Sequence, residues 1–144
     1  MRPKYIIIHH SAISREQNNA QFDAIVRYHK QLGWGNVGYH RIIEPSGQIR
    51  QGRAFNEIGA HCKEQGMNYQ SLGICLTGNF DSEKPTNQQI FALRDELKAR
   101  ADQFKIPAKN ILFHRDLARY KSCPGKNMSI DFVRSLVAPQ GGRK

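Results

Sequence analysis

Two histidines and one cysteine of this 144-residue chain are residue types that bind zinc in proteins. His9 and His114 each end a short apolar run, and Cys123 lies nine residues after His114 in the segment KSCPG. A zinc site with three protein ligands leaves a fourth position for water, which it activates while polarising a carbonyl. The residues therefore indicate hydrolytic metal chemistry. On residue types alone a second interpretation stays open, with both histidines hydrogen-bonded at strand ends and Cys123 a small buried side chain.

The elements that must position these residues alternate between strands and helices. Apolar runs and periodicities predict strands at residues 4–9 (KYIIIH), 39–43, 48–51, 72–77 and 111–114, and helices at residues 22–32, 86–104 and 129–137. Residues 56–70 show no period and are predicted as a surface loop. This alternation favours an α/β fold, with a single central mixed sheet of about five to six strands and helices packed on both faces. Binding sites in such folds gather at strand ends, where His9 and His114 lie.

Length and composition bound the class of protein. The length suits one domain over residues 1–144, with a core at about 4–137 and a flexible tail at 138–144. The chain is 39% hydrophobic and 24% charged, which is typical of globular proteins. Its longest apolar run, Tyr5–Ile8, is too short for a membrane span of about 20 residues. Polar residues after Ile8 also interrupt any signal peptide, so we expect the chain to be cytoplasmic as synthesised.

The net charge of +10 favours an anionic partner: nucleic acid, an anionic membrane face, or an acidic polymer such as cell wall. No Lys/Arg block exceeds two residues and no nucleic-acid-binding motif is present, so nucleic acid is not expected. The three cysteines are an odd number without regular spacing, which argues for reduced thiols. Of these, Cys75 is expected in the core. A monomer is the expected state for a basic domain of this size.

Six segments follow one another along the chain: IIIHHSA, LGWGNVGYHRII, GQIRQGR, IGAH, NYQSLGICLTGNF and FHRDLARYKSCPG. Each motif is weak by itself, but the ordered set covers the chain from about residue 5 to residue 136. In this order the segments resemble the type 2 N-acetylmuramoyl-L-alanine amidases. That family includes phage lysozymes of the T7 type and the animal peptidoglycan recognition proteins.

The resemblance implies that His9, His114 and Cys123 are zinc ligands, and that Zn²⁺ is the cofactor. The implied reaction is hydrolysis of the amide bond between the lactyl group of N-acetylmuramic acid and L-alanine of peptidoglycan. Catalytic members keep a cysteine where Cys123 lies, whereas members that only bind peptidoglycan often have serine there, and this favours an enzyme. Relatives vary at the position of His10, which we interpret as a neighbour of the ligand.

The resemblance also implies roles for three residues outside the ligand set. Tyr39 matches the tyrosine of the family's G-Y-H motif, and Lys121 matches the lysine two residues before the cysteine; both are implied in catalysis. The Lys121 ammonium would stabilise an oxyanion, and the Tyr39 hydroxyl would hydrogen-bond the water or the oxyanion, since a phenol is a poor general base. His61, in IGAH, is implied in substrate binding. His40 is expected to point to the face opposite Tyr39 in the predicted strand.

Several biological roles are compatible with the predicted amidase activity. A phage or prophage endolysin, which waits in the cytoplasm and acts on the cell wall after release, is favoured because neither a signal peptide nor a wall-binding repeat is evident. Two alternatives stay open: a recognition module that binds muropeptides without cutting them, and an amidase that recycles soluble muropeptides. A nucleic-acid- or polymerase-binding protein is a further alternative, suggested by the charge and by the T7-type relative, without independent support in the sequence.

Overall fold

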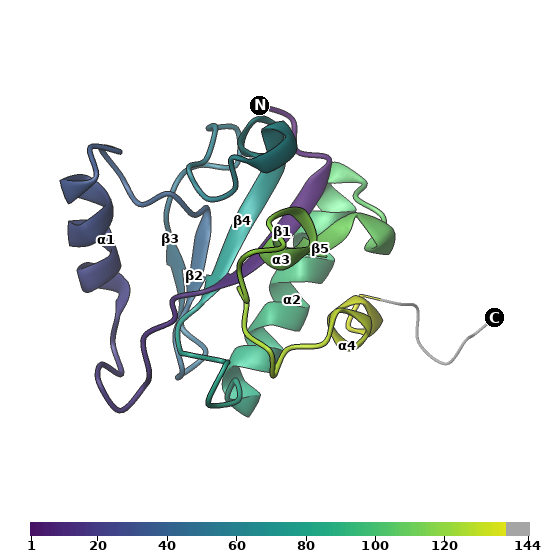
Figure 1. The fold of residues 1–144 in the computed structure, drawn as a ribbon. Helices are drawn as coiled ribbons and strands as arrows, with labels where there is room; N and C mark the ends of the chain where they lie inside the picture. Colours follow the sequence, from purple (N-terminus) through teal and green to yellow (C-terminus); the bar gives the residue numbers. More distant parts are fainter. Residues whose placement is uncertain (138–144) are drawn as a thin grey trace.

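The computed structural model describes residues 1–137, and its five strands form one mixed sheet in the order β3-β2-β4-β1-β5 (Figure 1). The strands are β1 Tyr5–His10, β2 Arg41–Ile43, β3 Ile49–Gln51, β4 Ser71–Leu76 and β5 Ile111–Phe113. β1 pairs in parallel with β4 and β5, β4 pairs in parallel with β2, and β3 is antiparallel to β2. The predicted mixed sheet of about five to six strands is confirmed.

Helices cover both faces of this sheet, as predicted. The helical segments are α1 Phe22–Gln31, η1 Glu64–Tyr69, α2 Asn87–Phe104, η2 Ala108–Asn110, α3 His114–Leu117 and α4 Ile130–Ser135. Leu93 of α2 and Val133 of α4 join the core on one face, whereas Ile25 of α1 and Met67 of η1 pack on the other. Within residues 1–137, no helix combines the length and the apolar character that crossing a membrane requires. The tail predicted at 138–144 lies outside the described residues.

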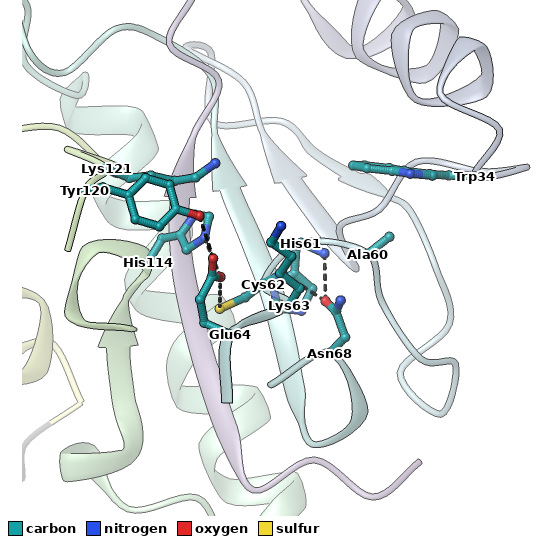
Figure 2. A pocket seen from close by; sticks show the side chains of 10 residues that line it. All are labelled: Trp34, Ala60, His61, Cys62, Lys63, Glu64, Asn68, His114, Tyr120 and Lys121. Carbon is teal, nitrogen blue, oxygen red and sulfur yellow. Dashed lines mark hydrogen bonds and ion pairs between the residues drawn. The ribbon is translucent and has the colours of Figure 1, made fainter. Parts of the chain in front are cut away.

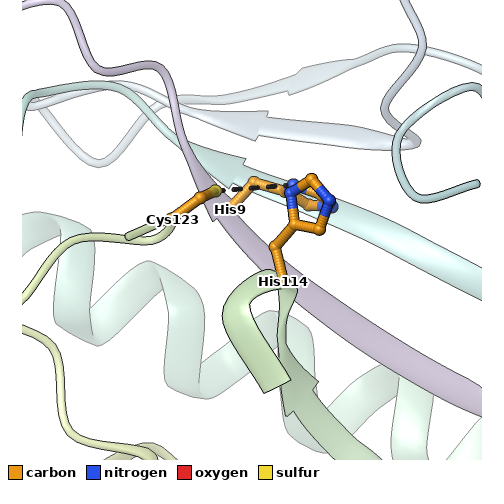
Figure 3. A group of neighbouring side chains, drawn as sticks. All are labelled: His9, His114 and Cys123. Carbon is orange, nitrogen blue, oxygen red and sulfur yellow. Dashed lines mark hydrogen bonds between the residues drawn. The ribbon is translucent and has the colours of Figure 1, made fainter. Parts of the chain in front are cut away.

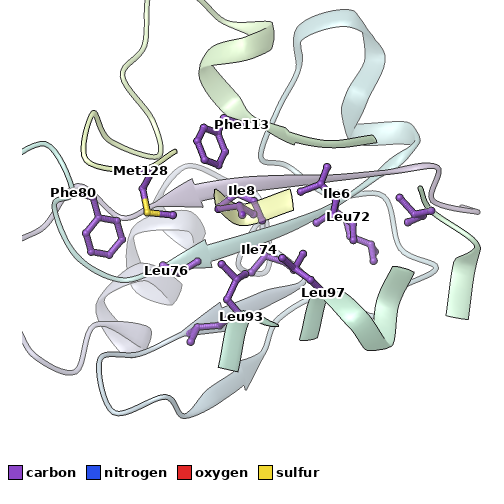
Figure 4. Packing of buried hydrophobic residues seen from close by; sticks show 14 residues of the cluster. Ile6, Ile8, Leu72, Ile74, Leu76, Phe80, Leu93, Leu97, Phe113 and Met128 are labelled. Atoms are coloured by element: carbon purple, nitrogen blue, oxygen red, sulfur yellow. The ribbon is translucent and has the colours of Figure 1, made fainter. Parts of the chain in front are cut away.

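Alternation along β1 decides which face of the sheet each of its two histidines occupies. Ile8 belongs to the large core that α2 covers (Figure 4), whereas Ile7 packs on the opposite face. His9 therefore faces the side of α1 and η1. His10 faces the other side, where its Nδ1 accepts the backbone N–H of Phe80 at 3.0 Å. The neighbouring histidine is thus a hydrogen-bonded structural residue.

The helix α2 is anchored to the sheet through its first turn. Thr86 caps the helix by accepting the N–H of Gln89 at 3.0 Å, and the Gln89 side chain accepts the N–H of Thr86 at 3.1 Å. The Gln89 amide is buried and donates to the carbonyls of Ile43 and Thr77 at 3.1 and 2.9 Å. Ile43 is the last residue of β2, and Thr77 directly follows β4. The Gln89 side chain therefore links these two strands at the edge of the sheet where His9 lies.

Each predicted strand differs from the observed one by one or two residues at an end, and two of these differences concern candidate site residues. The strand predicted at residues 39–43 begins at Arg41, because the regular pairing with β3 ends at the Arg41–Gln51 pair. Beyond it, the Arg53 N–H donates to the Tyr39 carbonyl at 3.0 Å. The strand predicted at residues 111–114 ends at Phe113, because His114 begins α3. The carboxylate of Asp116 accepts the N–H of Phe113 at 2.9 Å and caps this short helix.

A third difference concerns the segment predicted as a loop at residues 56–70. It contains η1, which begins at Glu64 and packs Met67 under the sheet beside Ile7. The segment shows no regular period because its turns are interrupted at Gln65 and Gly66, which both have positive φ. This segment forms one wall of the site described next.

Candidate metal centre

His9, His114 and Cys123 come together at the carboxyl ends of β1 and β5 (Figure 3). Their candidate ligand atoms all lie within 4.8 Å of one another, and Cys123 Sγ is 3.7 Å from His9 Nδ1. The topology explains the convergence, because β1 and β5 are adjacent parallel strands and end at the same edge of the sheet. The structure thus gathers the three residues that the sequence indicated as metal ligands.

The donor set and its spacing fit a zinc ion. Tetrahedral zinc with bonds of about 2.0 to 2.3 Å holds its ligand atoms roughly 3.3 to 3.7 Å apart. The distance of 3.7 Å between Cys123 Sγ and His9 Nδ1 matches such a ligand edge, and the other two separations are no more than 4.8 Å. Two imidazoles and a thiolate also form a mixed set that zinc accepts in catalytic sites.

The segment that carries Cys123 is held from both sides. The backbone N–H of His10 donates to Cys123 Sγ at 3.4 Å, and Arg115 N–H donates to the Cys123 carbonyl at 2.9 Å. The next residue but one, Gly125, has a φ of 106°, and a Cβ there would lie 2.5 Å from the carbonyl carbon of Phe80. The glycine of KSCPG is therefore required by close backbone approach as well as by positive φ.

Burial sets the protonation of the three candidate ligands. It lowers the pKa of His9 well below its ordinary value, and nearby His61 and His114 lower it further. Burial and Lys121 also lower the pKa of His114, although Glu64 opposes them. Both imidazoles are therefore neutral near pH 7 and keep a lone pair for a metal. Burial raises the pKa of the Cys123 thiol to about 11, so metal binding would have to displace its proton.

His61, predicted to bind substrate, lies directly behind His9. Its Nδ1 is 3.0 Å from His9 Nε2, and its Nε2 is 3.4 Å from Ser71 Oγ. Ser71 Oγ donates its own proton to the carbonyl of Met67 at 2.6 Å, so it can only accept from His61. His61 Nε2 therefore carries the proton donated to Ser71, and His61 Nδ1 accepts the proton on His9 Nε2. The Nδ1 lone pair of His9 is then free and faces Cys123. Sequence reasoning missed this contact, because nothing in IGAH indicates a partner 52 residues away.

A groove of about 460 Å³ opens beside His114 (Figure 2). Both His61 and Lys121 line it, so two further residues singled out from the sequence lie along the same groove. Figure 2 shows Trp34 at the end of the groove opposite Lys121. Trp34 also packs on the ring of His29, with the ring centroids 4.5 Å apart. The groove therefore offers an aromatic surface at one end and a cation at the other.

Tyr39 approaches the centre from a second hollow of about 370 Å³, which it lines with Tyr28 and His29. Its ring centroid is 5.1 Å from that of His9. Burial raises the pKa of Tyr39 well above its ordinary value, and the thiols of Cys75 and Cys123 raise it further. The hydroxyl therefore stays protonated and can donate a hydrogen bond, but it cannot act as a base near neutral pH.

Cys75 and His40, which the sequence analysis also considered, are buried parts of the fold. Cys75 is fully buried in the core, as predicted. His40 is also fully buried; its Nδ1 accepts the N–H of Gly73 at 3.0 Å, and its Nε2 is 2.8 Å from the carbonyl of Glu57. Both ring nitrogens of His40 are thus engaged by the backbone.

Glu64 is a neighbour of the centre that sequence reasoning did not find. Its Oε1 lies 3.5 Å from His114 Nε2, and its Oε2 accepts the hydroxyl proton of Tyr120 at 2.7 Å. Cys62 Sγ lies 3.6 Å from Oε1. Burial raises the pKa of Glu64, but the Tyr120 hydrogen bond, a backbone N–H and His114 outweigh it and lower the pKa to about 2. Glu64 is therefore a carboxylate throughout the neutral range.

Comparison with known proteins identifies relatives of this arrangement. The family model described as N-acetylmuramoyl-L-alanine amidase matches residues 1–126. Peptidoglycan-recognition protein SC1a of Drosophila melanogaster is 32% identical over 129 residues, covering 86% of this chain and 69% of the relative. The endolysin of Enterobacteria phage K11 is 34% identical over 120 residues, covering 80% of this chain and 76% of the relative.

Solved structures agree with the sequence relatives. The N-acetylmuramoyl-L-alanine amidase LysC from Clostridium intestinale superposes with a TM-score of 0.83 at 32% identity, covering 94% of this chain and 85% of that one. A single family thus accounts for the order of the motifs, for the mixed sheet and for the residues gathered at its edge. By its sequence and by its fold, the chain belongs to the N-acetylmuramoyl-L-alanine amidase family.

Proposed function

We propose that this protein is a zinc-dependent amidase of peptidoglycan. The bond cut is the amide between the lactyl group of N-acetylmuramic acid and L-alanine. One observation carries the proposal: His9, His114 and Cys123 converge within 4.8 Å beside a groove. The family and the relatives named as amidase and endolysin support the reaction class.

In the proposed reaction, the residues around the metal centre have separate roles. A zinc ion held by His9, His114 and Cys123 would supply an activated water and Lewis acidity at the scissile carbonyl. Tyr39 keeps its proton and donates a hydrogen bond to the oxygen on which negative charge develops. The exposed ammonium of Lys121, on the groove side, stabilises the same charge electrostatically.

Substrate would lie along the groove, with the scissile amide at the His114 end. We assign substrate contact to His61, which lines the groove while its Nδ1 holds His9. Burial lowers the pKa of His61 to about 3, so it meets the substrate as a neutral imidazole. Lys63 and Lys121 are the cations that line the groove, and Lys121 is the one at its His114 end.

The proposed biological role is that of an endolysin. We propose that the chain is made in the cytoplasm, acts as a monomer and reaches the cell wall after release. The kinship with a phage endolysin and the net charge of +10 support this role, because the wall is an anionic polymer. A recognition module without activity is the main rival, since several relatives are named as peptidoglycan-recognition proteins. Cys123 favours the enzyme, because it completes a metal-binding trio that serine would weaken.

The test combines zinc content with turnover. Purified wild-type protein is analysed for zinc per chain and for new free amino groups released on purified sacculi. We expect about one zinc per chain, and loss of both zinc and amine release in Cys123→Ser. Cys62→Ser, which replaces a thiol outside the trio, is the matched control and should keep its zinc. Zinc without amine release would support the recognition module, and no zinc in folded, zinc-supplemented wild type would overturn the proposal.

A further inference from the structure

The carboxylate of Glu64 sits between the two walls of the groove at its His114 end. It belongs to the first turn of η1, and its Oε1 faces His114 Nε2 at 3.5 Å (Figure 2). From the other wall, the Tyr120 hydroxyl donates to its Oε2 at 2.7 Å. Both oxygens therefore have partners, and only 17% of the Glu64 side chain is exposed.

An imidazole has two nitrogens, and the partner of one decides what the other can do. A carboxylate can only accept, so a hydrogen bond to Glu64 requires the His114 proton on Nε2. That tautomer leaves the Nδ1 lone pair for a metal ion. His9 has the same arrangement, with Nε2 against His61 and Nδ1 toward Cys123. Each candidate imidazole ligand is thus backed by one partner at the nitrogen that does not face the ion.

We propose that Glu64 is a positioning residue of the metal centre, which holds His114 in the ligating tautomer and orientation, and that Tyr120 holds Glu64 in turn. This inference rests on the proposed zinc site. Carboxylates behind ligating histidines raise the basicity of the imidazole and fix its ring. Glu64 acts through His114 and not on the substrate, because the oxygen away from His114 is already occupied by the Tyr120 hydroxyl.

The same atoms allow a competing account. Cys62, Glu64 and His114 also offer ligand atoms within 4.8 Å of one another, so this trio could hold a second cation. Hydrogen bonding explains the distances without an ion, because Cys62 Sγ lies 3.6 Å from Oε1 as a thiol donor. Burial and the nearby Glu64 carboxylate raise the pKa of Cys62 to about 12, which keeps that thiol protonated. The two accounts differ in how many ions the protein binds.

The test measures zinc affinity by competition with a chromogenic chelator on the purified full chain. Glu64→Ala should weaken zinc binding by about 10- to 100-fold, as expected for loss of a partner behind a ligating histidine. Glu64→Gln keeps an acceptor oxygen and should lose roughly threefold, and Tyr120→Phe should lose a similar amount. The control is Glu16→Gln, an exposed carboxylate on another loop, which should bind zinc as the wild type does. The Co²⁺-loaded proteins give a second readout, with a shifted absorption spectrum expected only for the Glu64 and Tyr120 variants.

Two results would overturn the inference. Unchanged zinc affinity and Co²⁺ spectrum in Glu64→Ala would do so, and a raised KM in that variant would then assign Glu64 to substrate binding. Two zinc ions per wild-type chain, falling to one in Cys62→Ser, would show that the trio is a second metal site. Failure of the proposed function gives a different result, because wild-type protein would then bind no zinc or release no amine.

Discussion

At Tyr39, burial decides which chemistry a phenol can perform. The ring packs 5.1 Å from that of His9, and its pKa is raised well above its ordinary value. The Tyr39 hydroxyl therefore stays protonated near neutral pH and can donate a hydrogen bond to a negatively charged oxygen. The developing oxyanion is where such a donor has the largest effect on rate, because the interaction strengthens in the transition state.

We therefore expect Tyr39→Phe to lower kcat by about 10²- to 10³-fold while leaving zinc content unchanged. The measurement is steady-state hydrolysis of a soluble muropeptide, with zinc quantified in the same preparation. Tyr28→Phe is the matched control, because Tyr28 lines the same hollow but is 57% exposed. A kcat for Tyr39→Phe within twofold of wild type would exclude the donor role.

Single residues differ in how far the sequence predicts their position. His9 lies at the end of β1 and His114 directly follows β5. The apolar runs of both strands are evident in the sequence, and adjacent parallel strands end at one edge, so the proximity of the two histidines follows. Glu64 and Tyr120 lie 56 residues apart in segments without a period, and no local pattern indicates that they meet. Family resemblance also points to His61 without revealing that it holds His9. Contacts behind the ligands depend on side-chain packing, which periodicity does not encode.

Among the elements, the loop carrying Cys123 depends on a carboxylate from another segment. Asp81 accepts the Ser122 hydroxyl at 2.8 Å and the Lys126 backbone N–H at 2.9 Å. The Ser122 hydrogen bond and then that of Lys126 lower the pKa of Asp81 below its ordinary value. These bonds span Cys123 from both sides, so Asp81 ties the loop to the end of β4.

We expect Asp81→Asn to lower the Tm of the metal-free protein by about 2–4 °C at pH 6 to 7, as a loss of local hydrogen bonding would. The difference should shrink as pH falls. A carboxyl with a lowered folded pKa stabilises the protein above its ordinary value of about 3.9, and that contribution is lost as pH falls through the lowered value. Thermal melts from pH 7 to pH 2.5 measure this. Asp102→Asn, an exposed position on α2, should show no such convergence, and a Tm difference for Asp81→Asn that persists at pH 2.5 would contradict the ionic origin.

Element existence was predicted better than element ends. β1 and α2 follow directly from an apolar run and from a capped, periodic helix. The ends of β2 and β5 depend on other parts of the chain. β2 starts where β3 provides a partner, and β5 ends where Asp116 caps α3. Short strands of three residues carry too few side chains to signal such boundaries locally.

At the scale of the whole molecule, the excess of 22 basic over 12 acidic residues gives a long-range field. Such a field raises the local concentration of an anionic polymer and speeds encounter by about 10- to 1000-fold at low salt. Salt suppresses it, since the Debye length falls from about 30 Å at 0.01 M to about 3 Å at 1 M. Contacts inside the groove are short-ranged and are screened much less.

This separation predicts two different salt responses. Amine release from sacculi should fall by about tenfold between 0.05 and 0.5 M NaCl, whereas kcat/KM on a small soluble muropeptide should change by less than about threefold.

The double variant Lys30→Glu/Lys98→Glu tests the cause of that difference, because both lysines are exposed, lie on α1 and α2, and stand outside the groove. Each Lys→Glu substitution lowers the net charge by two, so the net charge of +10 becomes +6 (10 − 4). We expect the variant to act more slowly on sacculi at low salt, to match the wild type at 0.5 M NaCl, and to be unchanged on the soluble substrate. Equal salt dependence on both substrates would place the charge effect in the groove, and the field of the whole molecule would then have no part in finding the wall.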